Sequence, residues 1–376
     1  MSTRNKKVYV TRPYLPPIEE FMPYLEKIWE SRQLTNIGPF HEELESKLED
    51  FLGVNHVSLV VNGTIALMLA LKALDIKGEV ITTPFSFVAT THVLKWINIK
   101  PVFVDIEPEY FNIDPDKIRA AITRQTKAIL PVHVYGNPCM NDQIEQISKE
   151  YNLKLIYDAS HAFGVKFNNK SILNFGDISV VSFHATKAFN TFEGGAIISR
   201  TEKLKAKIDK LRNYGFVGES KIEGFGINGK MNEFQASLGI LQLKFIDEQV
   251  AKRKKIVETY KNGLKEIDGI LFIPARDGVL NNHSFLPILV DPLKYGNTRD
   301  FLYTKLKKNN IFARKYFYPL ISDLSIYSKF PSAAKSNLPV SAKISQQVLC
   351  LPLYTDLEYE VIVEIIEIIK NNSKWN

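Results

Sequence analysis

Three groups of residues with chemical potential stand at or just after the ends of apolar, strand-like runs. They are Asn62-Gly63-Thr64, Asp158 and Lys187. A lysine that is partly desolvated between two such runs has a lowered pKa and becomes nucleophilic. A carboxylate at the end of an apolar run needs a partner. Taken singly, each group also fits a structural role, as a helix cap or a surface lysine.

The combination favours a cofactor site. A glycine and a hydroxyl at a helix N-terminus form an anion site, because free N–H groups and the helix dipole both attract negative charge. Together with an acidic residue and a lysine, such an anion site matches the three groups by which proteins bind pyridoxal phosphate. These groups are its phosphate, its ring nitrogen and its aldehyde. Lys187 follows Asp158 by 29 positions (187 − 158), the length of one strand-to-strand excursion.

The elements that must position these residues follow an alternating pattern. Short apolar runs separated by helical patterns predict an α/β fold with a mostly parallel sheet and helices on both faces. Ligands bind such sheets beyond the carboxyl ends of the strands. The predicted strands are Val57–Val61, Glu79–Thr83, Pro101–Asp105, Ala128–Val134, Leu153–Tyr157, Ile178–Phe183 and Gly195–Ser199.

The pattern changes near Phe245. A long polar helix is followed by the strand-like run Phe285–Val290, a helix from Thr298 to Lys308 and a terminal helix near Leu357–Ile369. This is typical of a smaller α+β domain. We therefore expect a large cofactor-binding domain over residues 1–245 and a small C-terminal domain over residues 246–376, since 376 residues exceed a single core.

Composition narrows the function classes. Hydrophobic residues make up 45% and charged residues 24% of the chain, as in ordinary globular proteins. No apolar stretch is long enough to cross a bilayer, so no membrane role is expected. Two cysteines without metal or disulfide spacing indicate the cytoplasm, and no metal site is expected.

The net charge of +7 raises the question of a nucleic-acid partner. Its densest run, Lys252–Lys255, lies in a helical pattern and fits a solvated helix face better than a nucleic-acid patch. No nucleic-acid partner is therefore expected.

One glycine motif needs to be weighed separately. Gly224–Gly229 matches the dinucleotide pattern G-x-G-x-x-G, but the preceding residues are polar rather than a buried strand. A phosphate-binding loop fails as well, because Met231 stands where a Mg²⁺-binding hydroxyl is required. The sequence does not support a nucleotide site there.

The chain resembles the DegT/DnrJ/StrS family of sugar aminotransferases over nearly its whole length. The resemblance implies the type I aminotransferase fold, pyridoxal phosphate as cofactor and an obligate homodimer with shared active sites. It rests on Thr35–Pro39, Asn62–Leu67, Thr83–Thr90, Pro131–Gly136, Asp158–Gly164, Ser182–Ala196, Gly226–Ala236 and Leu351–Tyr354.

The resemblance also implies a role for each site residue. Lys187 would carry the cofactor as a Schiff base, and Asp158 would pair with its ring nitrogen. Gly63, Thr64 and Ser182 would hold the phosphate. The remaining cofactor contacts would be Phe87 stacked on the ring, His161 near the phenolic oxygen, where many relatives have glutamine, and Asn228 reaching the cofactor of the neighbouring subunit.

The implied reaction moves the amino group of L-glutamate to a nucleotide-linked keto sugar. A sugar-dehydratase branch of the family has histidine in place of the lysine, so Lys187 favours transamination. The loop Ser182–Gly195 resembles enzymes that act on C4 of dTDP-4-keto-6-deoxy-D-glucose. The expected product is dTDP-4-amino-4,6-dideoxy-D-glucose, for O-antigen or another surface polysaccharide. Candidate substrate contacts are Thr35, Asn36, His184, Arg314 and Tyr316.

Rival interpretations stay open. One rival hypothesis stays within the family and gives the enzyme a different substrate, either a 3-keto nucleotide sugar or a UDP-linked 4-keto sugar. The other makes the chain a scaffold or regulatory protein that keeps the fold but catalyses no reaction. Intact Asp158 and Lys187 argue against this second hypothesis.

Overall fold

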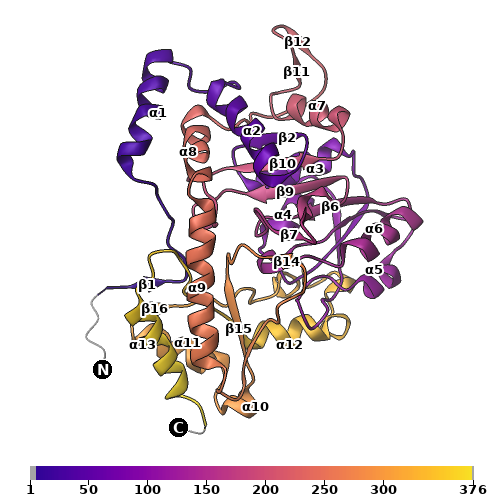
Figure 1. Ribbon diagram of the computed structural model, residues 1–376. Helices are drawn as coiled ribbons and strands as arrows, with labels where there is room; N and C mark the ends of the chain where they lie inside the picture. The colour runs from indigo at the N-terminus through magenta and orange to yellow at the C-terminus, as the bar shows by residue number, and fades with distance from the viewer. Residues whose placement is uncertain (1–5, 375–376) are drawn as a thin grey trace.

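The central sheet has the predicted α/β character. The computed structural model describes residues 6–374 (Figure 1). The strands of this sheet are β2 (Val57–Val60), β3 (Glu79–Thr82), β4 (Lys100–Phe103), β5 (Thr126–Leu130), β6 (Lys154–Asp158), β9 (Ile178–Ser182) and β10 (Gly195–Ser199). Their order is β2-β10-β9-β6-β5-β3-β4. Only β10 runs antiparallel to its neighbours in this sheet, which confirms the prediction of a mostly parallel sheet.

Helices cover both faces because consecutive strand residues point to opposite sides. Val80 packs on one side with α3 (Gly63–Ala73), α4 (Ala89–Trp96) and α7 (Glu202–Leu211). Ile81, its neighbour in β3, packs on the other side with α5 (Pro115–Ala121) and α6 (Asn141–Glu150). Along β2, Leu59 packs on that second side with α2 (Pro39–Leu52) and α8 (Glu233–Leu243).

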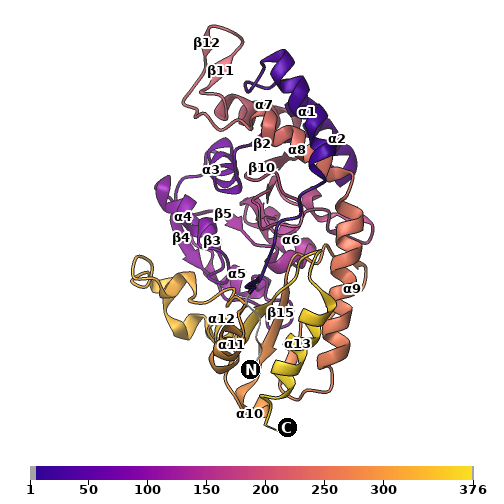
Figure 2. The same ribbon diagram turned by 90° about the vertical axis from the view of Figure 1, so that its left-hand side faces the viewer.

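The C-terminal part has its own sheet and its own core. Strands β13 (Ile270–Phe272), β15 (Leu286–Val290) and β17 (Val348–Leu351) form an antiparallel sheet. The core shared with this sheet comes from α9 (Ile246–Leu264), α11 (Arg299–Lys308) and α13 (Tyr359–Lys370). Figure 2 shows α9 running down one side of the molecule, from the central sheet toward these elements.

Other elements join the two parts. The expected boundary at residue 245 lies between α8 and α9, and the division into two domains stays a prediction. Strand β1 (Val8–Tyr9) pairs in parallel with β16 (Ile311–Phe312), so the N-terminal strand packs on the C-terminal part. The remaining helices are α1 (Ile18–Ser31), α10 (Pro292–Tyr295) and α12 (Pro339–Gln347), and 3₁₀ turns lie at Val134–Gly136, Ile172–Asn174, Ile321–Asp323, Pro331–Ala333 and Lys335–Asn337.

Two small sheets stand apart from the cores. Strand β14 (Val279–Leu280) pairs with β7 (Lys166–Phe167), which pairs with β8 (Lys170–Ser171). Strands β11 (Phe216–Val217) and β12 (Lys221–Ile222) form a hairpin that projects at the top of Figure 1. Gly224–Gly229 follows this hairpin and leads to Lys230, which bridges to β2. The strand that leads into this glycine run, β12, is exposed rather than buried, and the next helix, α8, begins only at Glu233. The run therefore lacks the strand–turn–helix context of a dinucleotide site.

The basic run on α9 is only partly a solvated face. Lys252 pairs with Glu248 at 2.6 Å, and Lys254 lies 3.9 Å from Glu258. Arg253 is buried instead, and donates to the carbonyl oxygen of Leu353. The expectation of a fully solvated face was therefore wrong for Arg253. Over residues 6–374, no helix combines the length and the apolar character needed to span a membrane.

Candidate active site

The start of α3 lies against β9 and has the features expected of an anion site. Asn62 caps the helix, and its Oδ1 accepts from the N–H of Ile65 at 2.9 Å. Gly63 and Thr64 precede the first N–H that bonds within the helix, so their N–H groups are left for an anion. A Cβ at position 63 would lie 2.9 Å from the Cβ of Ser182. Glycine at this position therefore lets the helix start sit against Ser182, as expected for a phosphate cradle.

Asp158 ends β6 and is held on both carboxylate oxygens. It is buried, its Oδ2 accepts from the Thr90 hydroxyl at 2.7 Å, and its Oδ1 accepts from the N–H of Ser160 at 3.1 Å. The hydroxyl of Thr90 also lies 2.8 Å from that of Ser86. Because Thr90 uses its proton toward the carboxylate, Ser86 must be the donor in that second bond. This chain of bonds fixes the orientation of the carboxylate.

Lys187 lies on the loop after β9, within electrostatic reach of Asp158. Removal of water around its ammonium group lowers its pKa to about 8, and the charge of Asp158 opposes that shift. Its Nζ lies 5.8 Å from the centre of the Phe285 ring. A lysine with this pKa is neutral in about a tenth of the molecules at pH 7, far more than an ordinary lysine, and this suits a nucleophile and a proton carrier.

His161 forms the other side of the Lys187 environment. Burial, reinforced by the nearby Lys187 charge, lowers its pKa well below the usual value, so the ring is neutral. Its Nδ1 faces the N–H of Tyr135 at 3.3 Å. Because Nδ1 accepts there, we assign the ring proton to Nε2. The ring stacks on Phe317 at 5.9 Å and meets Phe285 edge-on at 4.8 Å.

Phe87 and His184 are accessible at this site. Phe87 is 58% exposed, and its carbonyl oxygen accepts from the N–H of Thr90, which links it to Asp158. His184 lies on the Lys187 loop, with Nδ1 2.8 Å from the Thr186 hydroxyl and Nε2 3.5 Å from Glu193. Ring stacking by Phe87 and substrate contact by His184 stay predictions.

Tyr316 packs against Phe285, which lies near Lys187, whereas Arg314 is exposed. Tyr316 meets Phe285 edge-on at 5.9 Å, and its carbonyl oxygen accepts from the Tyr135 hydroxyl. Burial raises the pKa of Tyr316, and the charge of Arg314 partly offsets this rise. Arg314 itself is exposed, and its backbone pairs with Cys350. Tyr316 packs against both Phe285 and Phe317, and these three rings form the aromatic wall of the site. Arg314 is not part of this wall.

Thr35, Asn36 and Asn228 stand outside this cluster. Thr35 and Asn36 lie in an exposed segment after α1, anchored by a bond from the N–H of Glu233 to the carbonyl oxygen of Leu34. Asn228 is also exposed, and its Oδ1 accepts from Lys230 Nζ at 3.1 Å. Within the described part of the chain, these three residues make no hydrogen bond to Asp158 or Lys187.

Sequence reasoning missed Thr90, Phe285 and Phe317. Thr90 belongs to the quoted stretch Thr83–Thr90, where its hydroxyl next to a helix start was a usable signal. Phe285 and Phe317 come from the C-terminal part, more than 90 positions after Lys187. No local pattern connects them with the lysine, because only the tertiary fold brings them together.

Known proteins resemble this chain over nearly its whole length. The chain is 50% identical over 367 residues to a dTDP-4-amino-4,6-dideoxy-D-glucose transaminase of Escherichia coli, covering 97% of this chain and 98% of that protein. It matches a crystal structure of DesI in the presence of its TDP-sugar product with TM-score 0.95 and 32% identity, covering 100% of this chain and 95% of that one. It also matches a putative sugar aminotransferase of Streptococcus pneumoniae, PLP-form, with TM-score 0.89 and 25% identity, covering 98% and 99% of the two chains.

The family assignment follows from the sequence as a whole. The profile of the DegT/DnrJ/EryC1/StrS aminotransferase family matches residues 17–370, which span the anion site, Asp158, Lys187 and the C-terminal aromatic wall. The predicted resemblance is thereby confirmed, and the chain belongs to the DegT/DnrJ/EryC1/StrS aminotransferase family.

Proposed function

We propose that this aminotransferase uses pyridoxal phosphate, held by the residues around Lys187. The start of α3 with Ser182 fits the phosphate, because a side chain at Gly63 would fill the space beside Ser182. Asp158 fits the ring nitrogen, since its carboxylate is fixed by hydrogen bonds and lies within electrostatic reach of the lysine. The family and the PLP-form relative support the same cofactor.

The proposed reaction moves the amino group of L-glutamate to C4 of dTDP-4-keto-6-deoxy-D-glucose, giving dTDP-4-amino-4,6-dideoxy-D-glucose. The observation that carries this proposal is the 50% identity, over nearly the full length of both chains, to a transaminase named for that product. We expect the product to serve O-antigen or other surface polysaccharide synthesis in the cytoplasm, where the free, buried Cys139 and Cys350 fit a reducing medium.

The side chains divide the work of proton transfer and charge stabilisation. The cofactor, when bound, supplies the electron sink. Lys187, neutral above a pKa of about 8, holds the cofactor and carries the proton at its Nζ. Asp158 keeps a negative charge facing the ring nitrogen. His161 offers an Nε2–H donor, the role that the amide of glutamine would play in relatives.

The site is proposed to be completed by a second copy of the chain. Asn228 is exposed, and the adjoining segment presents Phe225, which is fully exposed. Aromatic residues are enriched in protein–protein interfaces, so Phe225 beside Asn228 supports a contact with a second chain in this segment. We expect a homodimer in which Asn228 reaches the phosphate of the neighbouring subunit's cofactor.

Substrate contacts are proposed on the same basis. We propose that His184, which lies on the Lys187 loop, and Tyr316, which packs against Phe285, contact the sugar. Thr35, Asn36 and Arg314 are proposed as outer contacts. The alternatives are a 3-keto nucleotide sugar and a UDP-linked 4-keto sugar.

The test supplies purified protein with L-glutamate and, in separate reactions, dTDP- and UDP-linked 3-keto and 4-keto sugars. We expect turnover with dTDP-4-keto-6-deoxy-D-glucose, with NMR locating the new C–N bond at C4, and no turnover by Lys187→Ala. Amination at C3, or preference for the UDP sugar, would replace the proposed substrate. Absence of cofactor absorbance together with unchanged activity in Lys187→Ala would refute the enzymatic assignment.

A further inference from the structure

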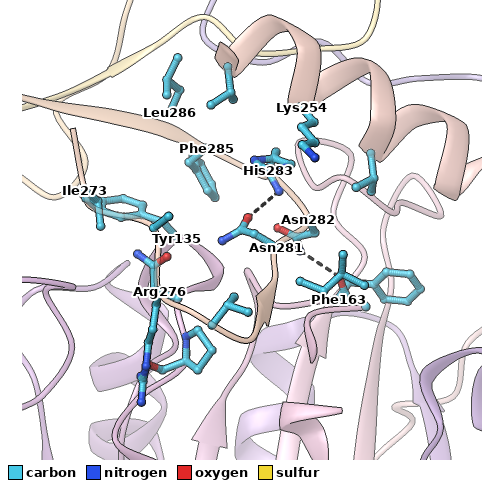
Figure 3. Close-up of a pocket in the computed structure, with 18 of the residues that line it drawn as sticks. Tyr135, Phe163, Lys254, Ile273, Arg276, Asn281, Asn282, His283, Phe285 and Leu286 are labelled. Carbon is cyan, nitrogen blue, oxygen red and sulfur yellow. Dashed lines mark hydrogen bonds between the residues drawn. The ribbon is translucent and has the colours of Figure 1, made fainter. Parts of the chain in front are cut away.

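A cleft outside the Asp158–Lys187 cluster shares Phe285 with the surroundings of Lys187. Its volume is about 540 Å³. It is lined by α9, by the segment 272–287 and by loops of the central sheet that include Tyr135 and Phe163 (Figure 3). Neither Asp158 nor Lys187 lines it. The volume lies in the range of small-molecule sites in proteins.

The walls of this cleft combine flat apolar surfaces with positive charge. Phe51 stacks on Phe163 with ring centres 5.7 Å apart. Lys254, Lys261 and Arg276 also line the cleft, and Asp247 is the one carboxylate among its described lining residues. The excess of positive over negative groups favours an anionic occupant.

Arg276 is fixed in place rather than free to fold away. Its guanidinium lies 4.7 Å from the ring centre of Phe167 and 5.6 Å from that of Tyr110, and it donates to the carbonyl oxygen of Pro138 at 3.0 Å. Within the described residues it has no carboxylate partner. Burial, with the charges of Lys254 and Lys261, lowers the pKa of His283 to about 4, in keeping with a positive local field.

Two residues belong both to this cleft and to the support of the cofactor site. The ring of Phe285 lines the cleft, faces Lys187 Nζ at 5.8 Å and touches His161 edge-on. Asn282 lines the cleft, and its Nδ2 donates to the carbonyl oxygens of His161 and Phe163, both at 2.9 Å. An occupant that presses on this shared wall acts directly on the surroundings of Lys187.

We propose that this cleft is a regulatory site for a small organic anion with an aromatic body, whose binding is transmitted to Lys187 through Asn282 and Phe285. The ring of such a ligand packs on the Phe51–Phe163 side, and its anionic group meets Lys254 and Lys261. Arg276 adds positive charge from the opposite end of the cleft (Figure 3). Coupling has a physical path here, since the same wall bounds both sites.

The first test titrates the cofactor-loaded protein with 8-anilinonaphthalene-1-sulfonate, an aromatic anion whose fluorescence reports burial. We expect saturable binding of one dye per chain. Val250→Trp, which fills the cleft from α9, should abolish it. Lys254→Glu combined with Lys261→Glu should weaken it by at least about fivefold. Lys255→Glu, on an exposed position of the same helix outside the cleft, should leave it unchanged.

The second test asks whether the two sites communicate. An anion behind Phe285 favours the ammonium form of Lys187, so the pH midpoint for capture of pyridoxal phosphate by the apoprotein should move upward with dye, and not in Val250→Trp. The proposal is overturned if no saturable binding occurs, if Val250→Trp binds like wild type, or if the midpoint stays fixed with dye bound. None of these outcomes depends on which sugar the enzyme aminates.

Discussion

The buried half of the candidate site and its exposed periphery are built in opposite ways. Asp158 has both oxygens bonded, and His161 is enclosed by Tyr135, Phe285 and Phe317. Asn228 and the neighbouring Phe225 instead stand in the open beyond the β11–β12 hairpin. The difference indicates that one chain supplies the cofactor chemistry, while the periphery is organised for a second chain.

The sharpest way to break this comparison is to mix two inactive variants. Lys187→Ala should lose about a thousandfold or more in activity, because the nucleophile and proton carrier is gone. Asn228→Asp should lose most activity by placing a carboxylate against the expected phosphate. If Asn228 acts across a dimer, one of the two active sites in each mixed dimer carries neither change. Random reassociation makes about half of the dimers mixed, so mixing and refolding should restore about a quarter of wild-type activity.

A matched control and a contrary result are available for this mixture. Asn213→Asp changes the residue whose backbone bridges Asn228 and whose side chain also binds Lys230. It should stay active alone. If mixing restores nothing although mixed dimers form, Asn228 serves its own chain's site, and the contrast between the two halves is wrong.

The lowered pKa of Lys187 predicts how the rate of cofactor binding depends on pH. Its pKa is lowered to about 8, so the neutral amine accumulates as the pH rises through that value. The rate at which apoprotein captures pyridoxal phosphate should therefore rise about tenfold per pH unit below 8 and level off above it. Stopped-flow absorbance measures this rate.

Asp158 supplies the control for that pH profile. Its charge raises the pKa of Lys187 against the larger effect of burial. Asp158→Asn should therefore move the midpoint of the profile to lower pH. A midpoint near the ordinary lysine pKa of about 10.4 in the unmodified protein would show that Lys187 is solvated rather than buried.

The same contrast explains what the sequence could predict. Asp158 is the last residue of a strand of the central sheet, and Gly63 and Lys187 come after other strands of that sheet. Strand ends are visible in local hydrophobic patterns. Phe285 and Phe317 were not foreseeable in this way, since they reach the site through packing of the C-terminal part on the central sheet. Arg253 was wrongly expected on the solvated face of α9, although it is buried. The periodicity of a helix predicts which of its faces is polar, but it does not reveal that one of the charged residues is buried.

Thr90→Val tests how much the hydrogen bond from Thr90 to Asp158 contributes to cofactor binding. The change keeps the shape of the side chain but removes the donor to Asp158 Oδ2, and a hydrogen bond to a charged group contributes about 1.5–3 kcal/mol. We expect the affinity for pyridoxal phosphate to fall by about tenfold or more, with a shift in the cofactor's visible absorbance. Equilibrium dialysis and spectroscopy measure both effects.

The neighbouring threonine is a close control for that variant. Thr91 is equally buried, but its hydroxyl has no hydrogen-bond partner within the described part of the chain. Thr91→Val should leave cofactor affinity unchanged. Thr90→Ser should retain most of the wild-type affinity. Equal losses in the two valine variants would mean that packing, rather than the bond to Asp158, matters at Thr90.

The smallest expected effect is at His161. Glutamine can accept from the N–H of Tyr135 with its amide oxygen and donate with its amide nitrogen, so it reproduces both functions assigned to the neutral ring. His161→Gln should change kcat/KM by no more than about threefold, whereas His161→Leu, which can do neither, should lose about tenfold. Because burial holds the pKa of His161 well below its usual value, neither variant should shift the pH profile between 6 and 8 through loss of a titrating histidine. A loss in His161→Gln as large as in His161→Leu would show that the flat ring against Phe317, rather than its donor, is what the site requires.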